Sequence, residues 1–261
     1  MPLFAISPSQ ELYYVLQTPE NAARSGLSFL FVHGLGSSSS FYATVMPALV
    51  EAGHQCLAFD MNGIDNSIQG HANDAIALLQ ALDISPSKVV AVGHSMGGLV
   101  AGTLATELDL AGAVLIGAVT PSEAIAAAFS QRITAVEQNG MEPMADSIPT
   151  GATGSKSTPT HHAFIRALLL SQTPRGYIGL CRAIAGAQPI DYSKARCPAL
   201  IIAGEEDKVV HVAGLEKIKD SWGAGSSGVS MEVLQGVGHW HCIEAGDKVG
   251  PLLVDFARQL A

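Results

Sequence analysis

The amino-acid sequence predicts an α/β protein with a mainly parallel sheet of eight strands flanked by helices. Two observations indicate this class. Short apolar runs alternate with stretches in which apolar residues recur every three or four positions, and each run ends in glycine, histidine or aspartate. Such alternation of strand and helix is typical of parallel sheets, because every parallel connection has to cross over the sheet. The length of 261 residues is compatible with one domain.

The predicted elements follow from these patterns in chain order. An antiparallel hairpin, 3–6 with 12–16, is expected to form one edge of the sheet. The core strands are expected at 27–32, 55–59, 89–92, 113–117, 199–203 and 230–234, and the helices at 41–52, 73–82, 96–107, 212–222 and 247–260.

An insertion of about eighty residues separates the strand that ends near Gly117 from the strand that begins near Ala199, far more than a connecting loop needs. Helical patterns occupy 122–138 and 162–187, and the polar stretch SIPTGATGSKSTPT between them has too little apolar content to pack, so a mobile middle is expected. Because active sites of open α/β sheets lie at the carboxyl ends of strands, the insertion is expected to cover the site. The alternative is an ordinary crossover lengthened by a surface loop. The expected division is an α/β core of residues 1–119 and 190–261 and a helical cap of residues 120–189.

Composition excludes several classes of partner. The formal net charge is −9 and only 14% of residues are charged, so a basic surface for nucleic acid or anionic lipid is missing. No apolar run approaches the roughly 20 residues that span a bilayer, and the first residues lack the pattern of a signal peptide. We therefore expect a cytoplasmic protein with a small-molecule partner, and leave a homodimer open. The scattered cysteines suggest buried thiols rather than disulfides or a zinc site.

The segment GHSMG, residues 93–97, follows the apolar strand VVAV and precedes a helical pattern. A serine on such a tight strand-to-helix turn is forced outward, and the flanking glycines avoid collisions with the neighbouring strand and helix. Ser95 is therefore the predicted nucleophile. The backbone N–H of Met96, at the start of the helix, is a candidate donor to an oxyanion. His94 is expected to pack beneath the turn.

A serine hydroxyl is a weak nucleophile and needs a base that a carboxylate orients. Asp207, in GEEDK, and His239, in GVGHW, each follow a predicted strand, so both should reach the same sheet edge as the serine. His239 is the predicted base and Asp207 the predicted acid. Glu205 and Glu206 are alternative acids. Their presence is also explained if they simply lie on the solvent-exposed surface of this loop. His241 is expected to support the site or to pack in the core.

A second oxyanion donor is expected from the loop HGLGSSSS, which follows the strand LSFLFV. The backbone N–H of Leu35 is the candidate, with Gly34 and Gly36 letting the main chain approach a substrate carbonyl. Gly34, Ser37 and Trp240 are candidate substrate contacts, although the serines of this run could instead cap the following helix. No cofactor or metal is expected, because neither a histidine pair at metal-ligand spacing nor a phosphate-binding glycine motif occurs.

Five segments together resemble the α/β-hydrolase superfamily, in the right order and over nearly the whole chain: HGLGSSSSF, DMNGIDNS, GHSMGG, AGEEDKVV and GVGHW. Within it, RITAVEQNGMEPMADSI and the run from LLLSQTPRGYIGLCRAIAGAQ to AGEEDK resemble the 3-oxoadipate enol-lactonase-like branch. In the segment that corresponds to the family's D-x-x-G-x-G-x-S motif, Asp65 replaces a glycine. We expect this carboxylate to lie on a solvated turn rather than to contact substrate.

The residues and the resemblance together imply the α/β-hydrolase fold and a serine hydrolase. The expected reaction is cleavage of a small carboxylic ester or lactone through an acyl-enzyme intermediate. Fold and triad do not fix the substrate, so two alternatives stay open. One is carbon–carbon bond hydrolysis or other cofactor-free chemistry such as that of haloperoxidases, and the other is a ligand receptor with slow turnover.

Overall fold

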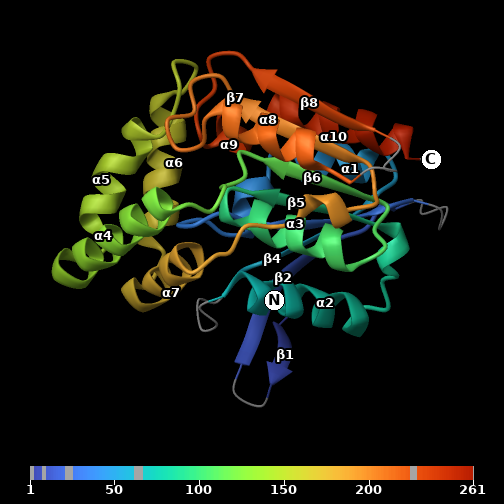
Figure 1. Cartoon of the computed structure of the whole chain (residues 1–261), viewed down its shortest axis with the longest axis horizontal. Helices are drawn as coiled ribbons and strands as arrows, with labels where there is room; N and C mark the ends of the chain where they lie inside the picture. Colours follow the sequence, from blue (N-terminus) through green and yellow to red (C-terminus); the bar gives the residue numbers. More distant parts are fainter. Residues whose placement is uncertain (1–2, 8–9, 21–25, 62–66, 224–227, 261) are drawn as a thin grey trace.

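Buried apolar strands lie side by side through the centre of the molecule and form one sheet (Figure 1). The computed structural model describes residues 3–7, 10–20, 26–61, 67–223 and 228–260. The strands are β1 (Leu3–Ser7), β2 (Gln10–Gln17), β3 (Ser28–Val32), β4 (Gln55–Phe59), β5 (Val89–His94), β6 (Gly112–Ile116), β7 (Ala199–Gly204) and β8 (Val229–Leu234).

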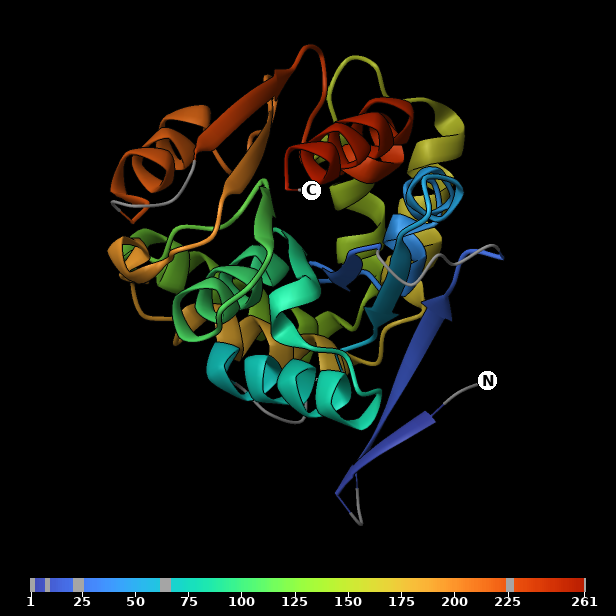
Figure 2. The same ribbon diagram turned by 90° about the vertical axis from the view of Figure 1, so that its right-hand side faces the viewer.

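Helices cover both faces of this sheet (Figure 2), with α1 packed on α10 over one face and α2 packed on α3 over the other. The core helices are α1 (Met46–Glu51), α2 (Ile68–Ala81), α3 (Met96–Glu107), α8 (Val212–Ser221), α9 (His241–Glu244) and α10 (Gly246–Gln259), with short 3-10 helices η1 (Ser39–Tyr42), η2 (Pro86–Lys88) and η3 (Tyr192–Lys194).

The strand order is β1-β2-β4-β3-β5-β6-β7-β8. The pairs β1–β2 and β2–β4 are antiparallel, and the other strand pairs are parallel. The predicted fold class, a mainly parallel sheet of eight strands with helices on both faces, is confirmed for the described residues. Because parallel strands share a direction, the loops after β3, β5, β7 and β8 all leave from the same edge of the sheet.

The central strands are buried over their whole length, as expected for parallel strands with helices on both faces. Every residue of β3, β5, β6 and β7 is buried, and their sequences SFLFV, VVAVGH, GAVLI and ALIIAG contain no charged residue. The predicted burial of the cysteines is also confirmed, since all four thiols lie in the core. In the part of the chain that the structure describes, no helix is both long and apolar enough to cross a membrane.

The insertion between β6 and β7 forms four helices on one side of the molecule (Figure 1), with α4 packed on α7 and α5 on α6. The predicted single helix at 162–187 is wrong in one respect: it is two helices, because the Thr173 side chain caps a new helix that begins with Pro174. These helices are α4 (Glu123–Asn139), α5 (Glu142–Gly151), α6 (Pro159–Leu170) and α7 (Pro174–Ala185).

The expectation that the polar stretch 147–160 would not pack is wrong. Helix α5 extends into it, and Ala152 and Thr153 after that helix are buried. Besides the apolar contacts of Ile148 and Ala152, hydrogen bonds that composition alone does not reveal hold the segment. The backbone N–H of Gly154 donates to a buried carboxylate, and that of Lys156 donates to the carbonyl of Gly236.

Two other helices begin elsewhere than predicted. The helix expected at 41–52 is the 3-10 helix η1 followed by the shorter α1, whose first turn carries a proline. Helix α2 begins at Ile68 rather than at 73, because the Ser67 side chain caps it by accepting a hydrogen bond from the backbone N–H of Gly70. The earlier start of α2 therefore comes from local capping rather than from apolar periodicity.

Close packing of α3 on the sheet gives the first testable prediction. A Cβ atom on Gly97 would lie 2.0 Å from the carbonyl oxygen of Val32, whereas a Cβ on Gly151, in α5, would meet nothing within 4 Å. Gly97→Ala should therefore lower the free energy of unfolding by about 2 kcal/mol or more, since the backbone of β3 or α3 has to shift. Gly151→Ala should change it by less than about 1 kcal/mol. Urea denaturation followed by circular dichroism measures both, and equal effects would contradict this account of the packing.

Candidate active site

The turn between β5 and α3 holds Ser95 in a strained backbone conformation. Its φ is 54° and its ψ is −115°, a left-handed region that non-glycine residues rarely adopt, and its N–H donates to the carbonyl of Ile116 at 2.9 Å. A Cβ on Gly93 would lie 2.0 Å from the carbonyl oxygen of Gly97, so the predicted need for glycine on both sides is met by the geometry. Such strain costs about 1–3 kcal/mol and is typical of functional turns.

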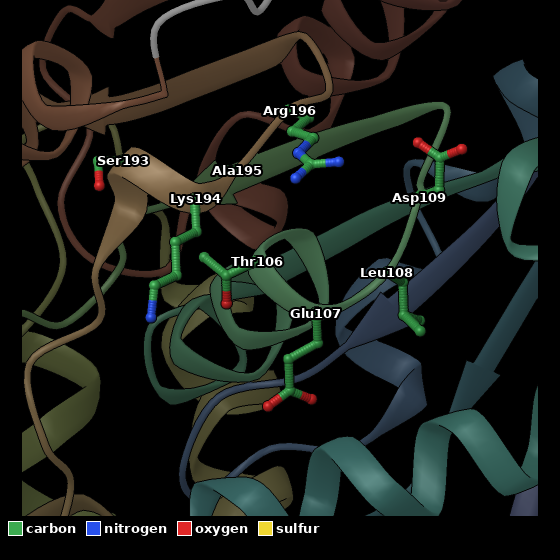
Figure 3. A pocket seen from close by; sticks show the side chains of 8 residues that line it. All are labelled: Thr106, Glu107, Leu108, Asp109, Ser193, Lys194, Ala195 and Arg196. Atoms are coloured by element: carbon green, nitrogen blue, oxygen red, sulfur yellow. The ribbon is translucent and has the colours of Figure 1, made fainter.

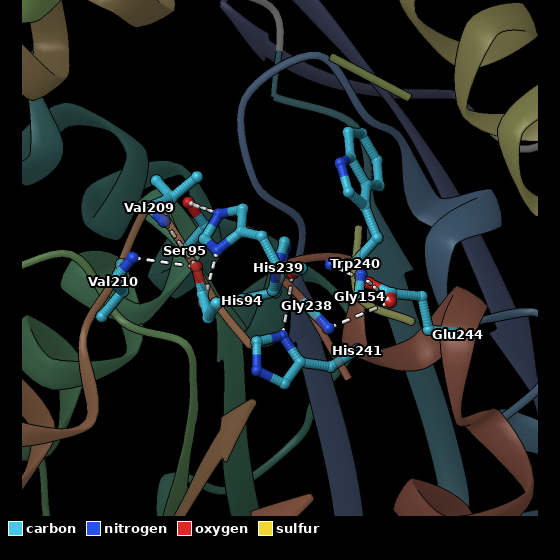
Figure 4. Close-up of polar contacts among 11 residues, drawn as sticks. His94, Ser95, Gly154, Val209, Val210, Gly238, His239, Trp240, His241 and Glu244 are labelled. Atoms are coloured by element: carbon cyan, nitrogen blue, oxygen red, sulfur yellow. Dashed lines mark hydrogen bonds and ion pairs between the residues drawn. The ribbon is translucent and has the colours of Figure 1, made fainter. Parts of the chain in front are cut away.

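Three side chains from three strand ends form a continuous hydrogen-bonded chain, part of which Figure 4 shows. The Nε2 atom of His239 lies 2.9 Å from the Oγ atom of Ser95, and its Nδ1 atom lies 2.8 Å from the Oδ2 atom of Asp207. An ionised carboxylate only accepts hydrogen bonds, so Nδ1 carries the imidazole proton and Nε2 is free to accept the serine proton. All three side chains are buried, which strengthens these interactions.

Asp207 is held as a carboxylate. Its Oδ1 atom accepts hydrogen bonds from the backbone N–H groups of Val209 and Val210, at 2.7 and 2.9 Å, while Oδ2 faces His239. Burial by itself would raise the pKa of the Asp207 carboxyl, but the adjacent His239 ring and the hydrogen bonds lower that pKa well below its usual value. Asp207 is therefore ionised at neutral pH and can orient the histidine.

The alternative acids make other contacts. The carboxylate of Glu205 accepts a hydrogen bond from the backbone N–H of Gly236 at 2.9 Å. The carboxylate of Glu206 accepts two hydrogen bonds from Ser155, from its N–H at 2.7 Å and its hydroxyl at 2.6 Å. Of the three neighbouring acidic residues, Asp207 is thus the one bonded to His239.

Two further histidines support the backbone of His239. The Nε2 atom of His94 lies 2.7 Å and the Nδ1 atom of His241 lies 2.8 Å from the carbonyl oxygen of His239. A carbonyl only accepts, so both of these ring nitrogens carry protons. Burial lowers the pKa of His94 well below its usual value and, against the opposing effect of Asp207, lowers the pKa of His241 to about 4. Both rings are neutral at neutral pH, and His94 stacks beneath the turn on Phe41, with ring centroids 4.2 Å apart.

The loop after β3 passes directly beside Ser95. A Cβ on Gly34 would lie 3.0 Å from the Cβ of Ser95 and 2.7 Å from the Nδ1 atom of His94, so the main chain comes as close as predicted. Neither the N–H of Leu35 nor that of Met96 donates a hydrogen bond to another described residue. Both remain candidate donors to an oxyanion.

Ser37 and Trp240, two of the predicted substrate contacts, lie buried in the structure. The Oγ atom of Ser37 and the Nε1 atom of Trp240 are buried, and neither has a hydrogen-bond partner among the described residues. The alternative role predicted for this serine run, capping of the following helix, is observed for Ser38. Its hydroxyl accepts a hydrogen bond from the N–H of Ser40 at the start of η1. Asp65 lies outside the described residues.

Sequence reasoning missed two residues that bear on the site. His33 directly follows β3, and its Nε2 atom accepts a hydrogen bond from the N–H of Met61 at 2.9 Å. Its Nδ1 atom therefore carries the proton and donates to the carbonyl of Gly34 at 2.8 Å. Glu244 is a buried carboxylate bonded to three backbone N–H groups. The available signals were a histidine directly after a buried strand and an acidic residue in the otherwise uncharged run GHWHCIEAG.

A cavity of about 770 Å³ lies away from these residues (Figure 3). It is at the amino ends of β6 and β7, beside Asp109 and Arg196, whereas Ser95 lies at the carboxyl edge of the same sheet. Ligands of open α/β sheets bind at the carboxyl edge, so this cavity is not the candidate active site. Among the described residues, no group of three or more His, Cys, Asp or Glu side chains is arranged to hold a metal ion.

Comparisons with known proteins agree with this architecture. The family model described as the alpha/beta hydrolase family matches residues 29–250. The chain is 26% identical over 273 residues to a provisionally named carbamate hydrolase, RutD, of Variovorax paradoxus (strain S110), covering 96% of this chain and 97% of that protein. The enol-lactonase from Burkholderia xenovorans LB400 has a TM-score of 0.84 at 22% identity, covering 98% of this chain and 100% of that one. A thermophilic esterase from Thermogutta terrifontis has a TM-score of 0.83 at 21% identity, covering 96% and 94%. These two structures share the fold.

The low pKa of His241 makes stability depend on pH. The ring titrates near 6.5 in an unfolded chain and at about 4 in the folded one, so between these values the unfolded state binds more protons. The contribution of His241 to the free energy of unfolding is fully present above pH 6.5 and is lost as the pH falls. By pH 4 the loss amounts to about 3 kcal/mol. His241→Asn keeps an N–H donor near the Nδ1 position and should lose correspondingly less stability between pH 7 and pH 4, by urea denaturation. The exposed His211→Asn is the control, and identical losses in native protein and His241→Asn would contradict the prediction.

Proposed function

Because the chain belongs to the alpha/beta hydrolase family, we propose that it is a serine hydrolase that cleaves a small carboxylic ester or lactone through an acyl-enzyme intermediate. The observation that carries the proposal is the hydrogen-bonded chain from Ser95 through His239 to Asp207. The strained serine turn and the ionised, buried Asp207 support the same assignment of nucleophile, base and orienting acid.

In the first half-reaction, the Nε2 atom of His239 accepts the hydroxyl proton of Ser95 while Oγ attacks the substrate carbonyl carbon. The negative charge that develops on the carbonyl oxygen is stabilised by the N–H groups of Leu35 and Met96. His239 then gives its proton to the leaving alcohol oxygen as the carbon–oxygen bond breaks. The products of this step are the alcohol and an ester of Ser95.

In the second half-reaction, His239 takes a proton from water, the resulting hydroxide attacks the acyl carbon, and the proton returns to the Oγ atom of Ser95 as the acid leaves. Asp207 stabilises the imidazolium formed in each half. With a lactone the alcohol stays attached to the acyl group, so the acid and the alcohol leave as one product.

The resemblance of the insertion to enol-lactonases favours a lactone as the substrate. A carbamate, whose carbonyl the serine could attack in the same way, is the second candidate. The carbamate is included because RutD, matched over nearly its whole length, carries that name. Both substrates use the same nucleophile and differ in the bond that is broken. Carbon–carbon cleavage, haloperoxidase-like chemistry and slow-turnover binding remain alternatives, and product analysis separates them from ester hydrolysis.

The direct test of this proposal measures hydrolysis of p-nitrophenyl acetate and butyrate, several lactones and an aryl carbamate. Ser95→Ala should stay folded by circular dichroism and lose about 1,000-fold or more in kcat, keeping only what binding and oxyanion stabilisation supply. The control is Ser87→Ala, the same change at an exposed serine just before the other end of β5, which should leave kcat unchanged.

Full activity of Ser95→Ala would contradict the proposed nucleophile. A native chain that reacts with a fluorophosphonate at Ser95, yet hydrolyses none of the panel, would keep the mechanism and reject the substrate class.

A further inference from the structure

Glu244, the last residue of the short helix α9, carries a carboxylate in an unusual setting. The residue is 8% exposed, and among the described residues no lysine, arginine or histidine forms an ion pair with it. Three backbone N–H groups satisfy it instead (Figure 4): those of Gly154 at 2.7 Å and Gly238 at 3.0 Å donate to Oε2, and that of Trp240 at 2.9 Å donates to Oε1. Burying a carboxylate is costly unless it is bonded in this way.

Two of the three donors flank His239 directly. Gly238 and Trp240 precede and follow it, so the carboxylate holds the peptide group between His239 and Trp240 and the one between Val237 and Gly238. Other groups bond the backbone of His239 itself: its N–H donates to the carbonyl of Ala152 at 2.8 Å, and its carbonyl accepts from His94 and His241. This loop is neither strand nor helix, so these bonds set the direction of the imidazole.

The third donor, Gly154, belongs to the insertion. The backbones of the two segments touch, because a Cβ on Gly154 would lie 2.5 Å from the carbonyl oxygen of Gly236, and a Cβ on Gly238 would lie 2.5 Å from the nitrogen of Gly154. The N–H of Lys156 also donates to the carbonyl of Gly236 at 3.1 Å. The segment after α5 and the His239 loop therefore form one hydrogen-bonded unit with Glu244 inside it.

From these contacts we infer that Glu244 is a positioning residue, which couples the insertion to the orientation of His239. The inference rests on the proposed function, because the role of His239 as base belongs to that proposal. Glutamate suits the position because both of its oxygens accept, and together they face three donors. In a glutamine one oxygen is replaced by an NH₂ group, which would point at one or two of these N–H groups and displace the loop.

The test compares Glu244→Gln with two matched variants, Glu205→Gln and Glu206→Gln. Glu205 accepts the N–H of Gly236 in the same loop, and Glu206 bonds to Ser155 in the insertion, yet neither side chain bonds to the residues that flank His239. Glu244→Gln should lower kcat about 10- to 100-fold, since small displacements of a base are costly. KM should change less than about threefold, and fluorophosphonate labelling of Ser95 should slow by a factor similar to that in kcat. The two control variants should stay within about twofold of the native protein in all three quantities.

A purely structural role predicts a different result. Glu244→Gln would then be less stable to urea but, assayed well below its unfolding midpoint, would match the native kcat and labelling rate, and the inference would be overturned. Failure of the native protein to label at Ser95 would instead reject the proposed function, and the inference with it.

Hydrogen exchange of the unaltered protein provides a measurement that does not depend on a variant folding. If Glu244 holds one unit, the amides of Gly154, Gly238 and Trp240 exchange with similar protection, because one opening exposes all three. Free exchange at Gly154 beside a protected Gly238 would show that the insertion is not coupled to the loop.

Discussion

A left-handed backbone at Ser95 places the serine hydroxyl at the carboxyl edge of the sheet, and the residues around the turn stabilise this conformation. The conformation is unfavourable for a residue with a side chain, and it persists because the N–H of Ser95 is bonded to Ile116 and its carbonyl accepts the N–H of Gly98. Glycine at 93 and 97 lets the strand and helix close around it. Without that close packing, the hydroxyl would not meet the histidine that follows β8, three strands later in the chain.

The parallel sheet then assembles the rest of the site. Ser95, Asp207 and His239 follow β5, β7 and β8, and the shared strand direction brings them to one edge although 144 positions separate the serine from the histidine. The sheet fixes where each loop leaves, but it does not orient the side chains on it. Orientation comes from buried hydrogen bonds. Backbone N–H groups donate to Asp207, two neutral histidine rings donate to the carbonyl of His239, and Glu244 accepts the N–H groups of the residues before and after that histidine.

These two sources of order explain what the sequence could predict. The strands, the serine turn and the positions of Asp207 and His239 were predictable, because apolar runs and the residues that end them are local features. Glu244 was missed because its partners are backbone groups of two distant segments, and residue identity does not record them. The stretch 147–160 was expected not to pack for the same reason, since hydrogen bonds to distant backbone and carboxylate groups help to hold it. Helix starts such as that at Ile68 depended on a serine cap that periodicity does not detect.

In the proposed mechanism Ser95 carries the acyl group during turnover, so the most direct experiment traps that intermediate. The native protein would be mixed with p-nitrophenyl butyrate, quenched in acid within the first turnovers, digested and analysed by mass spectrometry. The peptide containing Ser95 should gain one butyryl group, in step with an initial burst of p-nitrophenol. A burst with the butyryl group on another residue would contradict this mechanism, as would steady turnover that continues unchanged in Ser95→Ala.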